Sequence, residues 1–228
     1  MKNRYTIRDY LSVNRSNLRE YRHVLLLLFW PTFGILFGLL ERVYQPGYYY
    51  PVYSPLDDYI PFNELFVIPY VFWFVFLIGM HAYLFFEDVG TFRKMMTYIM
   101  ITYGVTLVVY LLFPTCQLLR PEEFARDNFL TRFMADFYVF DTNTNVCPSL
   151  HVVGSLAVVF ASRNTPRFRT PGWQCFFIIA GILICISTVF LKQHSIIDIF
   201  AALPLCFAAN YLSYRPRRAN SKDLLKEM

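Results

Sequence analysis

The stretch Cys147-Pro-Ser-Leu-His-Val-Val-Gly-Ser155 places a proline, a serine and a histidine at the start of an apolar segment. A second stretch, Ser187-Thr-Val-Phe-Leu-Lys-Gln-His-Ser-Ile-Ile-Asp198, has a histidine that a carboxylate follows four residues later. Each of the two histidines, His151 and His194, stands at one end of an apolar run. The two stretches therefore predict that polar side chains meet at one rim of an apolar helical bundle.

The composition of the whole chain is that of a protein that crosses a membrane several times. Of its 228 residues, 56% are hydrophobic and only 16% are charged, and the mean hydropathy is +0.38. A typical soluble domain has about 45–50% apolar and about 25% charged residues. A soluble domain would not bury so much apolar surface, so we predict an all-α, polytopic membrane protein with a single domain over 1–228.

Apolar segments divide this domain into helices that approach the length of a bilayer core, which takes about 20 helical residues. We predict six transmembrane helices, at 24–40, 65–86, 95–113, 148–162, 173–191 and 195–212. The six-helix bundle, 24–212, lies between a basic N-terminal segment, 1–23, and a basic tail, 213–228. Because the number of spans is even, both termini are expected on the same side of the membrane.

The basic residues orient this bundle. Both terminal segments and the predicted loops 87–94 and 163–172 carry arginine or lysine, and all of them fall on one side. Cytoplasmic loops are enriched in Lys and Arg, so we predict that both termini are cytoplasmic. Arg120, His151 and His194 then lie together at the non-cytoplasmic face. The basic residues form no isolated patch, and the sequence therefore does not favour nucleic-acid binding.

His194 and Asp198 form the candidate nucleophilic centre. At positions i and i+4 of one helix, the two side chains share a face. The Asp198 carboxylate can accept a hydrogen bond from one ring nitrogen of His194, which leaves the other nitrogen as nucleophile or base. Ionisable residues in a transmembrane helix usually mark a functional site. The alternative is a structural polar pair that joins this helix to its neighbours.

His151 follows Pro148 and Ser149 at the expected start of the fourth span. Free backbone N–H groups and the positive end of the helix dipole favour an anion at such a position. We interpret His151 as the acid that protonates a leaving alkoxide. Ser149 is either the N-cap of the helix, a donor to a phosphate oxygen, or both.

Two cations are expected at the same face. Arg120, followed by Pro121, offers a planar guanidinium suited to phosphate. Lys192 either supplies a second cation or extends its ammonium group to the membrane interface. The face lacks a carboxylate cluster of the kind that holds magnesium, so we predict no metal and no other cofactor. The sequence leaves open whether Cys116 and Cys147, on the same side, form a disulfide.

In order and spacing, these residues resemble the type 2 phosphatidic acid phosphatase superfamily, integral-membrane enzymes that act on lipid phosphates. That family carries three signatures, Lys-x6-Arg-Pro, Pro-Ser-x-His and Ser-Arg-x5-His-x3-Asp. The corresponding segments here are Arg120-Pro121, Pro148-Ser149-Leu150-His151 and Ser187-x6-His194-x3-Asp198. The resemblance covers most of the chain from Phe113 onward.

Two positions depart from the signatures. Phe113 stands where the first signature has lysine, and Thr188 stands where the third has arginine. Two phosphate-binding cations are therefore missing. The candidates to replace them are Lys192, Arg126 and Arg132.

The resemblance implies metal-independent phosphoryl transfer on a lipid substrate, a phospholipid or an isoprenoid phosphate, at the outer face of the plasma membrane. His194, oriented by Asp198, would attack phosphorus and form a phosphohistidine, and His151 would protonate the departing oxygen. The charge on the phosphoryl oxygens must be stabilised in the transition state. The residues expected to do this are Arg120, Lys192, Ser149 and Ser187.

The reaction type remains open between hydrolysis and transfer. The form Cys-Pro-Ser-Leu-His, together with Asp57-Asp58-Tyr-Ile-Pro-Phe, resembles the branch related to inositol phosphorylceramide synthases, which transfer a head group to a lipid alcohol. The short loops favour hydrolysis instead. A transporter would carry its ionisable groups at mid-membrane depth, and a non-catalytic relative would explain the missing cations. The sequence does not determine the lipid tail, head group, acceptor or oligomeric state.

Overall fold

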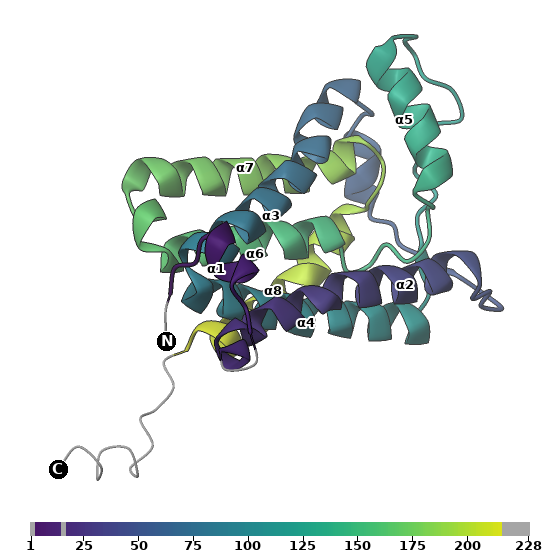
Figure 1. Cartoon of the computed structure of the whole chain (residues 1–228). Helices are drawn as coiled ribbons and strands as arrows, with labels where there is room; N and C mark the ends of the chain where they lie inside the picture. The colour runs from purple at the N-terminus through teal and green to yellow at the C-terminus, as the bar shows by residue number, and fades with distance from the viewer. Residues whose placement is uncertain (1–2, 15–16, 216–228) are drawn as a thin grey trace.

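The computed structural model describes residues 3–14 and 17–215, and this part of the chain is mostly helical (Figure 1). Residues 1–2, 15–16 and 216–228 of the two predicted basic terminal segments lie outside the described residues. The helices are α1 (Ile7–Leu11), η1 (Leu18–Leu28), α2 (Phe29–Arg42), η2 (Pro55–Tyr59), η3 (Glu64–Phe66), α3 (Val67–Glu87), α4 (Val89–Leu112), α5 (Phe129–Phe140), α6 (Leu150–Asn164), η4 (Pro166–Phe168), α7 (Pro171–Phe190) and α8 (Ile196–Tyr214). Two short strands, β1 (Tyr50–Pro51) and β2 (Thr115–Cys116), pair in parallel.

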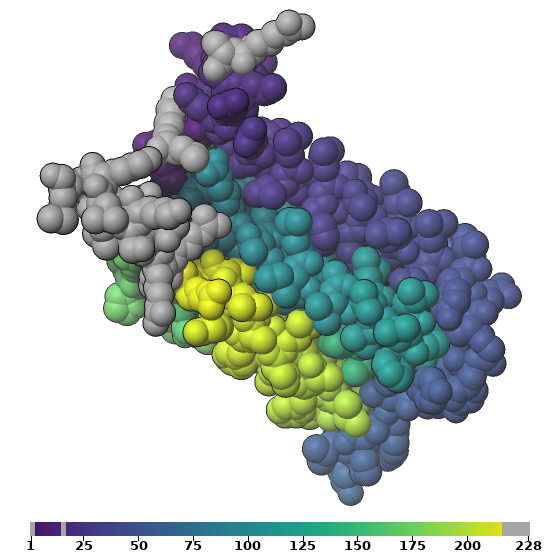
Figure 2. All heavy atoms as spheres, turned by 90° about the horizontal axis from the view of Figure 1, so that it is seen from below, coloured from purple at the N-terminus to yellow at the C-terminus, as the bar shows by residue number. Residues whose placement is uncertain are grey.

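The helix α6 lies at the centre of the bundle and contacts α3, α4, α7 and α8. Ten of its 15 residues are buried. Its small side chains, such as Ala157 and Ala161, are fully buried and allow the neighbouring helices to approach closely. Seen from below, α2, α4 and α8 lie side by side along one face of the molecule (Figure 2).

Within the described residues, the number of helices that can cross a membrane by length and composition is five rather than the predicted six. They are Leu18–Arg42, Glu64–Glu87, Val89–Leu112, Pro171–Phe190 and Ile196–Tyr214. The predicted fourth span, 148–162, corresponds to α6, which has 15 residues and is about 22 Å long. A bilayer core is about 30 Å thick. Neighbouring helices cover most of α6, so its length does not have to match the lipid.

The third span begins earlier than the sequence predicted. α4 starts at Val89, where the carboxylate of Asp88 accepts a hydrogen bond from the backbone N–H of Thr91 at 3.0 Å. The predicted loop 87–94 is therefore wrong, because Arg93 and Lys94 belong to the first turns of the helix. An N-cap aspartate satisfies a free amide and favours a helix start at this position. Lys94 is exposed and Arg93 is partly exposed, so both basic side chains can reach the surface from the first turns of the helix.

The segment 116–146, which joins the predicted third and fourth spans, contains the helix α5. Asn128 caps this helix and accepts hydrogen bonds from the backbone N–H groups of Leu130 and Thr131. α5 stands beyond the end of the bundle at which α7 ends (Figure 1). We refer to this end, which carries α5, β1, β2 and the 191–195 turn, as the site end.

The opposite end of the bundle carries the first described residues and the end of α8 (Figure 1). Most of the predicted N-terminal segment 1–23 is folded there rather than being a simple charged extension. The rings of Tyr5, Tyr10, Tyr21 and His23 pack together, with centroids 5.2 to 6.4 Å apart. The backbone N–H of Tyr5 donates to the carbonyl of Phe86 at 2.7 Å, which fixes the segment to the end of α3.

Candidate active site

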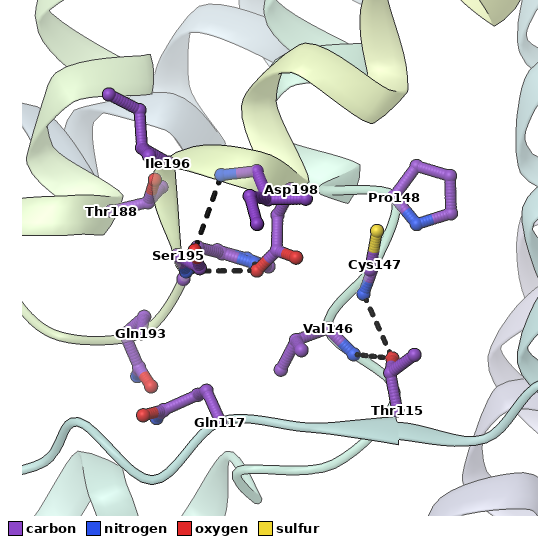
Figure 3. Close-up of polar contacts among 12 residues, drawn as sticks. Thr115, Gln117, Val146, Cys147, Pro148, Thr188, Gln193, Ser195, Ile196 and Asp198 are labelled. Atoms are coloured by element: carbon purple, nitrogen blue, oxygen red, sulfur yellow. Dashed lines mark hydrogen bonds and ion pairs between the residues drawn. The ribbon is translucent and has the colours of Figure 1, made fainter. Parts of the chain in front are cut away.

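His194 lies directly before the helix α8 and is held by the carboxylate of Asp198. The Nδ1 atom of His194 is 3.0 Å from Oδ2 of Asp198, and the same oxygen accepts a hydrogen bond from the backbone N–H of Ser195 at 3.0 Å (Figure 3 shows Ser195 and Asp198). Asp198 is fully buried. With Nδ1 donating to the carboxylate, Nε2 of His194 carries the free lone pair of the imidazole.

His151 lies in the first turn of α6 and is held by aromatic rings. Its ring centroid is 4.4 Å from that of Tyr70 and 4.5 Å from that of Trp73, both on α3. The rings of His151 and His194 are 5.9 Å apart and inclined at 69°. The imidazole from the first turn of α6 and the imidazole from the turn before α8 therefore meet at the site end. His194 was predicted to share a helix face with Asp198, but it lies two residues before the first residue of α8.

Ser149 immediately precedes α6 and lies beside the His194–Asp198 pair. Its backbone N–H donates to the carbonyl of Asp198 at 3.2 Å. Its hydroxyl makes no capping hydrogen bond, is buried, and has no partner in the described part of the chain. Because a buried hydroxyl without a partner is unfavourable, Oγ of Ser149 is available as a donor to a bound phosphoryl oxygen. The interpretation of Ser149 as a side-chain N-cap is not supported.

Arg120 reaches the site but is bound by other protein groups. Its two terminal nitrogens donate to the carbonyls of Tyr138, Asp141 and Thr142 at 2.8 to 2.9 Å, and one of them also contacts Oε1 of Gln193. The guanidinium lies 4.4 Å from the ring centroid of Tyr138. Arg120 therefore fixes the end of α5 against the residue next to His194, and it is not a free phosphate ligand in this arrangement.

Lys192 is bound by a backbone group of another segment. Its Nζ donates to the backbone carbonyl of Asp57 at 2.8 Å. The carboxylate of Asp57 in turn accepts hydrogen bonds from the Ser195 hydroxyl at 2.6 Å and the Ile196 N–H at 2.9 Å. Burial lowers the pKa of Lys192, and the nearby Asp57 and Asp58 oppose this effect. Lys192 thus fixes the 54–59 segment to the start of α8.

Ser187 is not brought into the site. Its hydroxyl is buried inside α7 and donates to the carbonyl of Ile184 at 2.6 Å. The next residue, Thr188, acts through its backbone, because its carbonyl accepts from the N–H groups of Gln193 and His194 at 2.9 and 3.2 Å. The predicted phosphate contact of Ser187 therefore finds no support in the geometry.

Residues 52–212 match the family model of the PAP2 superfamily. The chain belongs to the PAP2 superfamily. Comparison with curated proteins and with solved structures gave no match. PAP2 members are generally phosphatases or phosphotransferases, and together with the apolar helices the family indicates a multi-pass membrane enzyme of the lipid phosphatase type.

The two departures from the PAP2 signatures are not compensated by the basic residues proposed from the sequence. Phe113 is 62% exposed at the end of α4. Arg126 pairs with Glu64 at 3.1 Å, and Arg132 pairs with Asp127 at 2.6 Å. In both pairs the arginine side chain is exposed. Each of the two arginines is therefore paired with a carboxylate.

Asp141 is a site residue that the sequence did not single out. Its Oδ2 accepts hydrogen bonds from the Tyr70 hydroxyl and from Nε2 of Gln193, both at 3.3 Å. Burial raises the pKa of Asp141, while His194 and Arg120 act in the opposite direction. No family signature includes Asp141. Its carboxyl group approaches the imidazoles only because three separate elements of the fold converge there.

Cys116 and Cys147 are free thiols, so the disulfide that the sequence left open is not formed. Burial, followed by the charge of Asp198, raises the pKa of Cys147 to about 12. Figure 3 shows Cys147 and Asp198 on facing segments of the site. Among residues 3–14 and 17–215, no group of three or more His, Cys, Asp or Glu side chains could hold a metal ion.

Proposed function

We propose that this PAP2 protein cleaves a phosphoester or pyrophosphate of a lipid at the non-cytoplasmic face of the plasma membrane, through a phosphohistidine. One observation carries the proposal: a carboxylate-bound imidazole, His194, faces a second imidazole, His151, at a ring separation of 5.9 Å. A phosphorus atom bound between the two rings can be attacked by one and can lose its leaving group to the other.

In the first step, Nε2 of His194 attacks phosphorus, a P–N bond forms and the P–O bond to the lipid alcohol breaks. Protonated His151 gives its proton to the departing oxygen. Asp198 stabilises the positive charge that develops on His194. In the second step, His151 takes a proton from water or from a hydroxyl, whose oxygen attacks phosphorus and releases His194.

The phosphoryl oxygens need donors that are in position before the reaction. The buried Ser149 hydroxyl and the free backbone N–H groups in the first turn of α6 supply them, with the positive end of the helix dipole. The guanidinium of Arg120 contacts Gln193 and contributes its positive charge to the site through this contact. Its hydrogen bonds to carbonyl oxygens make it a fixed charge rather than a mobile clamp.

A second candidate function is head-group transfer from a phospholipid to a lipid alcohol, and the charge of the site favours it. Two signature cations are absent, and the carboxyl group of Asp141 lies near His194. A phosphomonoester carries up to two negative charges, whereas a phosphodiester carries one. Fewer cations and an added carboxyl group therefore select for the singly charged diester, which is the donor in a transfer reaction.

The experiment is a product analysis with the purified full-length protein in lipid nanodiscs. The protein is incubated with a phospholipid labelled in its phosphate, with and without ceramide or diacylglycerol as acceptor. Free labelled phosphate supports hydrolysis, and a new labelled phospholipid that requires the acceptor supports transfer. If neither product exceeds the level of protein-free nanodiscs for phosphatidic acid, isoprenoid pyrophosphate or phosphatidylinositol, the proposed enzymatic function is rejected.

The predicted orientation can be tested separately. Single cysteines introduced in a cysteine-free variant, at Glu122 in the 117–128 loop and at Arg167 in η4, would be labelled with a membrane-impermeant maleimide in intact cells. We expect labelling at 122 and none at 167 until the cells are opened. The reverse pattern would place the site on the cytoplasmic side.

A further inference from the structure

A groove runs along the surface of the bundle between α7 and α8, with α6 as its floor. Its volume is about 420 Å³. The walls and floor are almost entirely apolar, with Val152, Leu156 and Val159 from α6, Ile178 and Ile182 from α7, and Leu203 from α8. In a membrane this face is in contact with lipid, so a hydrocarbon chain has direct access to it.

The groove lining comes within one residue of the candidate active site on two helices. Val152 follows His151 in α6, and Ile199 follows Asp198 in α8, and both line the groove. At its far end the lining includes Arg163, near the end of α6. Arg163 is eleven positions after Val152, which corresponds to about 16 Å along the helix. The groove is therefore an apolar path that leads from the two histidines deep into the membrane.

Gly181 explains why α7 can border this path. A Cβ atom at Gly181 would lie 3.3 Å from Cγ2 of Val159 and 3.9 Å from Cβ of Ser155. The backbone of α7 therefore approaches α6 closely at this point, and the larger side chains on either side of the glycine form the wall. The path is built by packing of the helices and does not depend on a loop.

We propose that this groove binds a hydrocarbon chain of the lipid substrate while the phosphate of the same molecule lies between His151 and His194. This inference rests on the proposed function and adds where the tail is bound. Because lipid tails are as apolar as the groove, binding of the chain gains little from the hydrophobic effect inside a bilayer. The groove instead fixes the direction of the chain, which places the phosphorus in line with His194 and selects for chain length.

A second, larger groove between α3 and α7 is the main competitor. Its volume is about 900 Å³, and its lining includes Phe72, Ile179 and Leu183. It contains no residue that is adjacent in sequence to His151, His194 or Asp198. We therefore assign the lipid tail to the smaller groove, between α7 and α8.

The chain offers a matched pair of positions on α7. Ile182 lines the α7–α8 groove and Ile179 lines the α3–α7 groove, and they are 52% and 51% exposed. The variants Ile182→Trp and Ile179→Trp would be compared as full-length proteins in nanodiscs. The readout is the ratio of kcat/KM for dioleoyl to that for dioctanoyl phosphatidic acid. We expect Ile182→Trp to lower this ratio about tenfold or more, and Ile179→Trp to leave it within about twofold of the original protein.

A second readout does not depend on turnover. A phosphatidic acid with a diazirine along one acyl chain would be photo-crosslinked to the protein, and the labelled peptides mapped by mass spectrometry. We expect labelling of α8 and of the Ile182 side of α7 that excess phosphatidic acid suppresses and excess phosphatidylcholine does not. If this labelling occurs without any turnover, the groove is retained and the enzymatic function fails. If suppressible labelling maps to α3, or if Ile179→Trp changes the chain-length ratio, the tail assignment is overturned.

Discussion

The two histidine-bearing segments of the site end, 147–155 and 187–198, use the same chemical group in two different environments. His194 is held by hydrogen bonds, since its Nδ1 lies against the buried carboxylate of Asp198. His151 is held by packing between Tyr70 and Trp73, and its Nε2 has no hydrogen-bond partner among the described residues. Two identical side chains are thus fixed by different kinds of interaction.

The difference has a chemical consequence. A carboxylate stabilises a positive charge on His194, as the formation of a phosphohistidine requires. Aromatic walls give no such stabilisation to His151, so its proton is more easily given up to a leaving oxygen. Substitutions of the two histidines, and then of the residues around them, test this division of roles.

The largest effect is expected from His194→Ala. Removal of the nucleophile should lower kcat by about 10⁵-fold or more and abolish any covalent phosphoenzyme. The measurement is turnover of the substrate identified by the product analysis, together with acid-sensitive labelling of the protein. Thermal unfolding would control for folding. Turnover within about tenfold of the original protein would remove His194 from the chemical step.

A smaller but qualitatively different effect is expected from His151→Ala. Loss of the general acid and base should lower kcat by about 10²- to 10⁴-fold. A substrate with a good leaving group, such as a p-nitrophenyl ester, needs no proton at the departing oxygen, so it should still phosphorylate His194. We therefore expect labelled phosphohistidine to accumulate, because water or the acceptor is no longer activated. Equal loss of labelling in both histidine variants would contradict the proposed division of roles.

Gly154→Ala tests the packing that holds His151. A Cβ atom at Gly154 would lie 2.9 Å from two atoms of the Trp73 ring and 2.9 Å from the Tyr103 hydroxyl. Accommodating it should cost about 1–3 kcal/mol of unfolding free energy. The shift of Trp73 should move His151 and lower kcat by about ten- to a hundredfold.

The matched control for this substitution is Gly79→Ala in α3. A Cβ atom there meets nothing within 4 Å. Alanine is favoured over glycine in a helix by about 0.5–1 kcal/mol, so this variant should be unchanged or slightly more stable, with unchanged turnover. Both variants would be compared by thermal unfolding in detergent and by kcat. If Gly154→Ala behaves like Gly79→Ala, aromatic packing does not position His151.

The helical spans could largely be predicted from the sequence because hydropathy over about 20 residues locates apolar helices. The pairing of His194 with Asp198 was predicted as an i, i+4 contact on one helix, but His194 lies in the turn before α8 and reaches Asp198 across the N-cap Ser195. The length of α6 could not be judged in this way. Its role as an enclosed helix depends on the neighbours that surround it.

The partners of the long polar side chains could not be predicted. Arg120 and Lys192 were expected to contact phosphate, yet each binds backbone carbonyls of segments that are distant in sequence. Such contacts depend on how the 54–59 segment and α5 fold over the site end. Asp141 was overlooked for the same reason, because its proximity to His194 arises only from tertiary structure.

The smallest effect concerns Asp141, a second carboxyl group near His194, which also binds the hydroxyl of Tyr70. Burial raises the pKa of Asp141. The folded protein therefore keeps this proton up to a higher pH than the unfolded chain, whose carboxyl group ionises near pH 3.9. In the interval between these two pKa values, the free energy of unfolding falls as the pH rises. We expect the Tm of the original protein, relative to that of Asp141→Asn, to fall across the interval and then become constant.

The comparison with Asp141→Asn can be measured by thermal unfolding in detergent from about pH 4 to about pH 8. Asp136→Asn, at an exposed position of α5, controls for the loss of a carboxyl group. A Tm difference that rises with pH would mean that the pKa of Asp141 is lowered instead. Because His194 lowers the pKa of Asp141, the interval should extend to higher pH in a His194→Ala background. An extension of this kind would show that Asp141 senses the charge of His194, and that the charge on the nucleophilic imidazole is balanced by two carboxyl groups rather than one.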